Sequence, residues 1–167
     1  QYLVEQAAIS YAPSLTALKE MSKKAKARKP DSGMELVAFG NPIVSAETSD
    51  RLKQVFMSEK LAPLPESERL VNELGKMYGS KRSKIYVGDQ AREETAKMES
   101  PKYRIVQFAT HGILNNVSPM YSHLVLAQNE KNPNEDGLLE AWEMKDLDLK
   151  ADMVILCLHD DAACESV

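Results

Sequence analysis

Two short apolar runs place the strongest limits on how this chain can fold. Residues 105–109 (IVQFA) and 151–158 (ADMVILCL) are rich in β-forming side chains. Continuous apolar runs of this length are typical of strands that are buried on both faces. Before and between them, strand patterns alternate with helix patterns, and this alternation predicts right-handed crossovers between parallel strands. The sequence therefore predicts an α/β fold with a mostly parallel sheet and helices on both faces.

The other expected elements follow from hydrophobic periodicity and from turn residues. Further strands are predicted at 7–11, 35–39, 84–87 and 123–127. Helices are predicted from Ser14 through Met21, over 67–79 and 93–99, and from Gly137 onward with Leu138, Leu139, Trp142 and Met144. Residues 45–66 are polar and interrupted by prolines, which predicts a loop with a helical turn around 51–56.

Composition limits the class of protein. A length of 167 residues, 43% of them hydrophobic, suits one globular domain, and a net charge of -4 gives no reason to expect a nucleic-acid partner. No apolar run approaches the roughly eighteen residues that cross a bilayer, so no membrane partner is expected. Only Cys157 and Cys164 are cysteines, which suits a reducing, cytoplasmic compartment. The start at Gln1 and the end at Val167 suggest a piece of a larger protein.

The ends of the two apolar runs carry the candidate catalytic residues. The first ends at His111 and Gly112, at the edge where open α/β sheets bind ligands, and glycine permits a sharp turn and a close approach of the backbone. The second ends near Cys157. A histidine and a cysteine on adjacent strand ends match a caspase-like cysteine peptidase, in which a thiolate attacks a carbonyl, an imidazole moves the proton and backbone N–H groups hold the oxyanion. This chemistry requires no metal and no organic cofactor.

Several longer motifs together resemble one family. They are YLVEQAAISYAPSLTAL at 2–18, AFGNP at 38–42, IYVGDQA at 85–91, RIVQFATHGILNN at 104–116, SHLVLA at 122–127 and DGLLEAWEMKDLDLKADMVIL at 136–156. The combination is similar to the CHAT domains, which are caspase-like, related to separase and often attached to tetratricopeptide repeats.

The resemblance implies a fold, a set of partners and two site residues. It implies that residues 1–167 are a partial CHAT domain, a caspase-like three-layer sandwich that is incomplete at its C-terminus. It also implies a protein or peptide substrate and a neighbouring tetratricopeptide-repeat region. Under the resemblance, His111 corresponds to the catalytic base and Gly112 to the glycine whose N–H helps to hold the oxyanion.

The chain departs from the family at the nucleophile. The family usually continues the last strand as Leu-Ser-Ala-Cys, whereas here Leu156 is followed by Cys157, Leu158 and His159. His159 thus occupies the cysteine position, and Cys157 lies two residues earlier, about 6.6 Å back along the strand. We expect Cys157 to be buried and inert, and the chain as written to have little or no activity.

Three explanations of this departure are open. The chain can be a non-catalytic pseudo-peptidase, a binding or scaffold module of a repeat-containing regulatory protein. Alternatively, Cys157 or Cys164 takes the nucleophile's place after a local backbone shift. Lastly, the final residues can be out of frame, because the codons CTC-TGC-CTG-CAT spell Leu-Cys-Leu-His but give Ser-Ala-Cys one base later. A weaker hypothesis is a zinc site formed by His111, His159 and Asp160 or Asp161.

Overall fold

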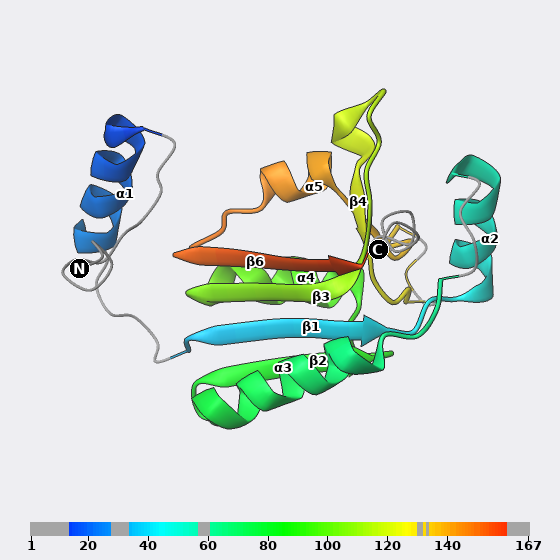
Figure 1. Ribbon diagram of the computed structural model, residues 1–167, viewed down its shortest axis with the longest axis horizontal. Coiled ribbons are helices and arrows are strands. Elements are labelled where there is room, and N and C mark those ends of the chain that lie inside the picture. The colour runs from blue at the N-terminus through cyan, green and yellow to red at the C-terminus, as the bar shows by residue number, and fades with distance from the viewer. Residues whose placement is uncertain (1–13, 28–33, 57–60, 130–131, 133, 160–167) are drawn as a thin grey trace, which may run out of the picture. The chain divides into compact units, whose positions relative to one another are not determined.

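In the described part of the computed structural model, six strands form one mixed sheet (Figure 1). The structure describes residues 14–27, 34–56, 61–129, 132 and 134–159. The chain divides into two units, Gln1–Ser32 and Gly33–Val167. Helices accompany the strands of the second unit, so its architecture is mixed α/β, in agreement with the predicted fold class.

The described residues of the first unit form the helix α1 (Leu15–Ala27). Its start was predicted from Ser14, whose Oγ accepts a hydrogen bond from the Ala17 N–H at 3.0 Å, as an N-cap residue does. Lys23 and Glu20 form an ion pair on its exposed surface. The strand predicted at 7–11 lies outside the described residues.

The parallel part of the sheet confirms the strands predicted from the apolar runs. Its spatial order is β2-β1-β3-β6, with β1 (Leu36–Pro42), β2 (Ser83–Gly88), β3 (Ile105–Ile113) and β6 (Met153–His159). Strand β4 (His123–Val125) pairs antiparallel with the last residues of β3. Strand β5 (Leu138–Glu140) pairs antiparallel with β4. Figure 1 shows β6 lying beside β3 along its length.

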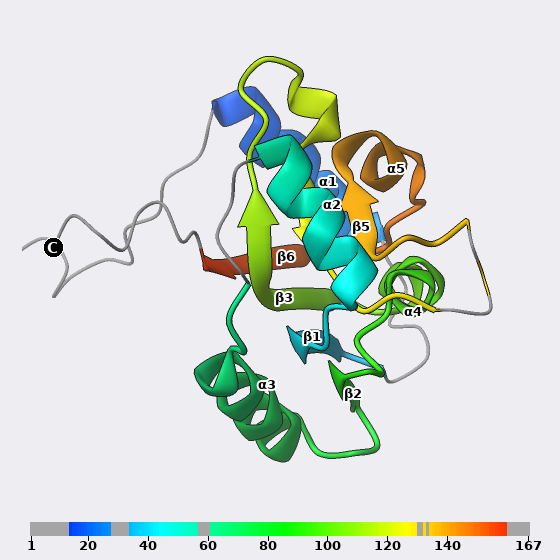
Figure 2. The same cartoon turned by 90° about the vertical axis from the view of Figure 1, so that its right-hand side faces the viewer.

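Strand β3 belongs to both parts of the sheet. Ala109 is its last residue paired with β1, whereas Gly112 and Ile113 pair antiparallel with β4. Thr110 Oγ1 donates a hydrogen bond to the Val125 carbonyl oxygen at this change of partner. The strand was expected to end within Thr110–Gly112, but it continues to Ile113, where β4 supplies new backbone partners. Figure 2 shows the resulting bend.

Helices cover both faces of the parallel strands. On one face α3 (Pro65–Tyr78) places Val71 against Leu36, Ala38 and Ala109. On the other face α4 (Glu93–Glu99) and α5 (Ala141–Asp146) contribute Ala96 and Met144 to the core cluster that contains Val37, Phe39, Val106 and Phe108. The alternation of side chains along a strand separates these two clusters.

Helix α3 was predicted over 67–79, and it lies against β1 at close range. A Cβ on Gly40 would lie 2.7 Å from Val71 Cγ2, so glycine is required where the helix meets the end of β1. The helix ends at Gly79, which adopts a positive φ of 77°. Of its predicted apolar stripe, Val71 is buried but Leu70 and Met77 are exposed.

Two local predictions were wrong. Residues 46–56 form a complete helix, α2 (Ala46–Phe56), rather than one turn, because Ser45 Oγ accepts the Thr48 N–H at 3.0 Å and Leu52 is buried. The helix expected from Gly137 begins only at Ala141. Glu140 and Glu143 form a capping box there, and residues 138–140 pair with β4 instead.

Two 3₁₀ turns complete the described structure, at Ser100–Lys102 and Pro119–Tyr121. Within the described residues, no helix is both long enough and apolar enough to span a membrane.

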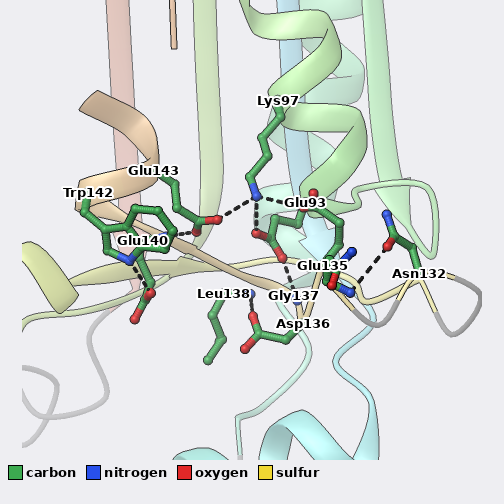
Figure 3. A network of polar contacts seen from close by, with 11 residues as sticks. Glu93, Lys97, Asn132, Glu135, Asp136, Gly137, Leu138, Glu140, Trp142 and Glu143 are labelled. Atoms are coloured by element: carbon green, nitrogen blue, oxygen red, sulfur yellow. Dashed lines mark hydrogen bonds and ion pairs between the residues drawn. The ribbon is translucent and has the colours of Figure 1, made fainter. Parts of the chain in front are cut away.

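A partly buried ionic cluster joins α4 to the β4–β5 connection and to α5 (Figure 3). Lys97 Nζ lies 2.8 Å from Glu93, 2.8 Å from Glu135 and 2.7 Å from Glu143. Glu93 is only 2% exposed, and its Oε2 accepts the Gly137 N–H at 2.8 Å. A single cation thus holds three carboxylates from three segments of the chain together.

Burial and ion pairing together set the ionisation of this cluster. Burial raises the pKa of Glu93 to about 7, although the hydrogen bonds from Lys97 and the Gly137 N–H act in the opposite direction. Burial alone would lower the pKa of Lys97, but the hydrogen bonds to Glu135, Glu143 and Glu93 raise it above its ordinary value. Lys97 therefore stays charged at neutral pH while Glu93 titrates.

Replacing the cation should destabilise the fold. Lys97→Met leaves Glu93, Glu135 and Glu143 without a counter-charge, and the free energy of unfolding at pH 8 should fall by about 3 kcal/mol. Near pH 5 the loss should be smaller, because Glu93 is then protonated. Urea titration measures both values. Lys76→Met, at an exposed position of α3, is the matched control and should change stability by less than about 0.5 kcal/mol. Equal losses from the two variants would contradict the role of the cluster.

The raised pKa of Glu93 predicts a pH dependence of stability with a definite sign. The folded state binds the Glu93 proton more tightly than the unfolded state, so this contribution is complete below about pH 4.5 and is lost as the pH rises through about 7. Glu93→Gln cannot ionise, and its side-chain oxygen can still accept the Gly137 N–H. Its unfolding free energy should therefore decrease less than that of the parent chain between pH 5 and 8. If the unfolding free energies of the variant and the parent chain change equally with pH, the pKa of Glu93 is not raised by folding.

Candidate active site

His111 lies buried in β3, beyond the last residue that pairs with β1. The residue is 3% exposed, and its Nε2 lies 2.8 Å from the carbonyl oxygen of Ala62. A carbonyl oxygen only accepts hydrogen bonds, so Nε2 must carry the proton. A neutral imidazole in this tautomer keeps its lone pair on Nδ1. Nδ1 is therefore the nitrogen that can accept a proton in a reaction.

The segment Leu61–Leu64, which we call the strap, brings Ala62 to His111. Leu64 is 7% exposed, and its N–H donates to Asn41 Oδ1 at 2.7 Å. Asn41 lies in β1, beyond the strand predicted at 35–39, and its Nδ2 donates to Glu68 Oε2 in α3 at 2.7 Å. The carboxyl end of β1 and the start of α3 together hold the strap in place.

The parallel register between β3 and β6 places the second candidate strand end. The two strands are adjacent, and their Cα partners run from Ile105 with Met153 to His111 with His159. The expectation that both strand ends share one edge of the sheet is therefore confirmed. Position 159 lies directly across from His111, about 4.8 Å away in the hydrogen-bonding direction.

The model of the CHAT domain family matches residues 1–167. The chain belongs to the CHAT domain family. This family is caspase-like and related to peptidases, which agrees with the mixed α/β architecture and with a histidine at the sheet edge. No curated protein and no solved structure matches the chain.

Cys157 of this CHAT domain is displaced from His111, as predicted, but it is not buried. Its register partner is Ala109, two residues before His111, and its side chain is exposed. The expectation of burial was wrong because α3 packs on β1, β2 and β3 and leaves this face of β6 open. Gln107 Nε2 lies 3.5 Å from the Cys157 sulfur and is the contact that the thiol makes across the strands.

Gly112 is required by packing rather than by backbone conformation. It does not adopt a positive φ, so the sharp turn expected there is absent. A Cβ at this position would lie 2.6 Å from Leu158 Cδ1, so the missing side chain makes room for Leu158 from β6. Glycine thus permits the close approach of Leu158, whereas the expected close approach to a ligand stays a prediction.

Sequence reasoning missed two participants of the site. Asn41 was visible only as part of the AFGNP motif, and its sequence signal is an asparagine directly after a strand pattern. The structure shows it with a φ of 45°, which asparagine tolerates better than most residues other than glycine. The Ala62 carbonyl has no sequence signal at all, because a backbone oxygen of any residue can make the contact.

The weaker hypothesis of a zinc site gains no support. Among the described residues, no group of three or more histidine, cysteine or acidic residues is placed to hold a metal ion. Asp160 and Asp161, which completed the hypothetical set, lie outside the described residues.

The geometry predicts how Cys157 reacts. In a Cys164→Ser background, iodoacetamide should alkylate Cys157, and His111→Ala should leave the rate unchanged. The reason is that the thiol is open to solvent and two residues away from the register position of the imidazole. Mass spectrometry of the modified peptide over time gives the rate. A rate that depends on His111 would show that the backbone of β6 shifts to bring the thiol to the base.

Proposed function

We propose that this CHAT domain is a caspase-like, three-layer cysteine peptidase scaffold for cleaving peptide bonds in protein substrates, and that the chain as written is inactive. His111 is the proposed general base and Gly112 N–H a proposed oxyanion donor. The position of the nucleophile is 159, which holds histidine in this chain.

The observation that carries the proposal is the register between β3 and β6. Position 159, which is the cysteine position by resemblance to the family, is the Cα partner of His111. Partners on adjacent strands point to the same face of the sheet, so a cysteine at 159 would present its sulfur beside the imidazole. The Ala62 carbonyl supports the assignment because it fixes the proton on Nε2 and leaves Nδ1 as the base.

The proposed reaction has two halves. In the first, Nδ1 of His111 takes the thiol proton, and the thiolate attacks the scissile carbonyl carbon. The oxyanion forms beside the Gly112 N–H and collapses to a thioester while His111 returns the proton to the leaving amine. In the second, His111 removes a proton from water, which attacks the thioester and releases the carboxylate product and the thiol. No metal or organic cofactor takes part.

The displacement of Cys157 supports an alternative for the chain as it stands. Its partner is Ala109 rather than His111, so the described structure does not pair a thiol with the proposed base. A pseudo-peptidase that binds protein partners would keep this fold without the reaction. In either case we propose a cytoplasmic protein that works next to a tetratricopeptide-repeat region, because CHAT domains are commonly linked to such repeats.

Restoring the family's nucleophile tests the proposal. The triple variant Cys157→Ser, Leu158→Ala and His159→Cys, extended by the C-terminal segment of another CHAT domain, should cleave members of a broad peptide library. Adding His111→Ala should reduce the rate by about 10²- to 10⁴-fold, the usual contribution of a positioned general base. Liquid chromatography with mass spectrometry of the library measures cleavage.

The matched control carries serine instead of cysteine at 159 and should have no activity, because it lacks only the thiol. A folded triple variant that cleaves nothing would favour the binding module. Cleavage that is insensitive to His111→Ala would also contradict the proposed mechanism.

A further inference from the structure

The strap is held by a chain of hydrogen bonds that begins in α3 and ends on His111. Glu68 Oε2 accepts from Asn41 Nδ2 at 2.7 Å, and Asn41 Oδ1 accepts from the Leu64 N–H at 2.7 Å. The Leu64 carbonyl accepts in turn from the Glu68 N–H at 3.2 Å. Both polar groups of Leu64 are therefore fixed, two residues away from Ala62.

Ala62 itself is exposed, so burial of its own side chain does not hold it in place. The position of its carbonyl oxygen depends on its anchored neighbour, and Leu64 is the buried member of the strap. Pro63 lies between the two residues and restricts the rotation of the backbone, so an anchor at Leu64 is transmitted to Ala62. The carbonyl in turn meets His111 Nε2 at 2.8 Å.

Asparagine is well suited to the anchoring position. The φ of 45° is tolerated by asparagine and glycine but strained for most other residues. The side chain must also accept from Leu64 and donate to Glu68 at the same time. Aspartate would place a negative charge against the Glu68 carboxylate, and glycine would keep the backbone but lose both hydrogen bonds.

We propose that Asn41 is a positioning residue for His111: it clamps the strap so that the Ala62 carbonyl holds the ring and its Nε2 proton in one orientation. The catalytic meaning of this clamp rests on the proposed function, in which Nδ1 of His111 is the base. The clamp itself is a physical contact that can be tested without any catalytic activity.

The test uses proton and nitrogen NMR of the chain as it exists. A ring N–H that is buried and hydrogen-bonded exchanges slowly with water, and His111 is 3% exposed, so its Nε2 proton should give an observable resonance. Asn41→Gly should abolish this resonance and accelerate exchange of the Leu64 amide about fivefold to tenfold, the effect of losing one hydrogen bond. His111→Gln assigns the signal among the three histidines of the chain.

Further variants separate positioning from folding. Glu68→Ala removes the partner of Asn41 Nδ2 and should broaden the His111 ring signal, whereas Glu68→Gln keeps an acceptor oxygen and should preserve it. Asn116→Gly, in an exposed loop, is the matched control for the change to glycine. His123 is buried and its Nδ1 bonds to the Tyr121 carbonyl at 3.0 Å, so its ring signals should stay constant and report an intact fold.

A His111 ring signal that survives Asn41→Gly and Glu68→Ala would overturn the proposal. If Asn41→Gly does not fold, the pair of Glu68 variants still decides, because Glu68→Ala and Glu68→Gln must then differ. The outcome is independent of peptidase activity. If the triple variant is inactive but the His111 ring signal responds to the Asn41 and Glu68 variants, the proposed function is refuted and the clamp stands. If the triple variant is active but the ring signal ignores these variants, the clamp is refuted and the proposed function stands.

Discussion

Strand β3 is the element on which the rest of this structure depends, because its backbone pairs with three other strands. Its first half lies between β1 and β6 in the parallel sheet, and its last residues pair antiparallel with β4. The change of partner falls at Thr110 and His111. The proposed base therefore lies where the two parts of the sheet meet, with hydrogen-bonded strand on either side.

Polar contacts from segments distant in sequence hold the His111 ring and helix α4 in place. The ring of His111 is reached by the strap, which Asn41 and Glu68 anchor. On the opposite face the Lys97 cluster fastens α4 to the connection that precedes β5. In both places one side chain satisfies partners from several segments, so a single substitution should loosen a whole connection rather than one contact.

The sequence predicted the parallel core because buried strands and amphipathic helices leave strong local patterns. Helix α4 and the strands around Phe39 and Phe108 follow directly from these patterns. Residues 138–140 were mistaken for helix because a three-residue strand is too short to show a period, and the capping box that starts α5 lies just after it. The exposure of Cys157 was not predictable, since it depends on which strands α3 covers.

Position 159 lies across from His111 only if β3 and β6 keep the same register in solution, and this register can be measured. Nuclear Overhauser effects between backbone protons of the two strands report which residues are partners. We expect contacts between His111 and His159 and between Ala109 and Cys157. A register shifted by two residues, with Cys157 across from His111, would place the native thiol beside the base and would refute the assignment of position 159 as the nucleophile position.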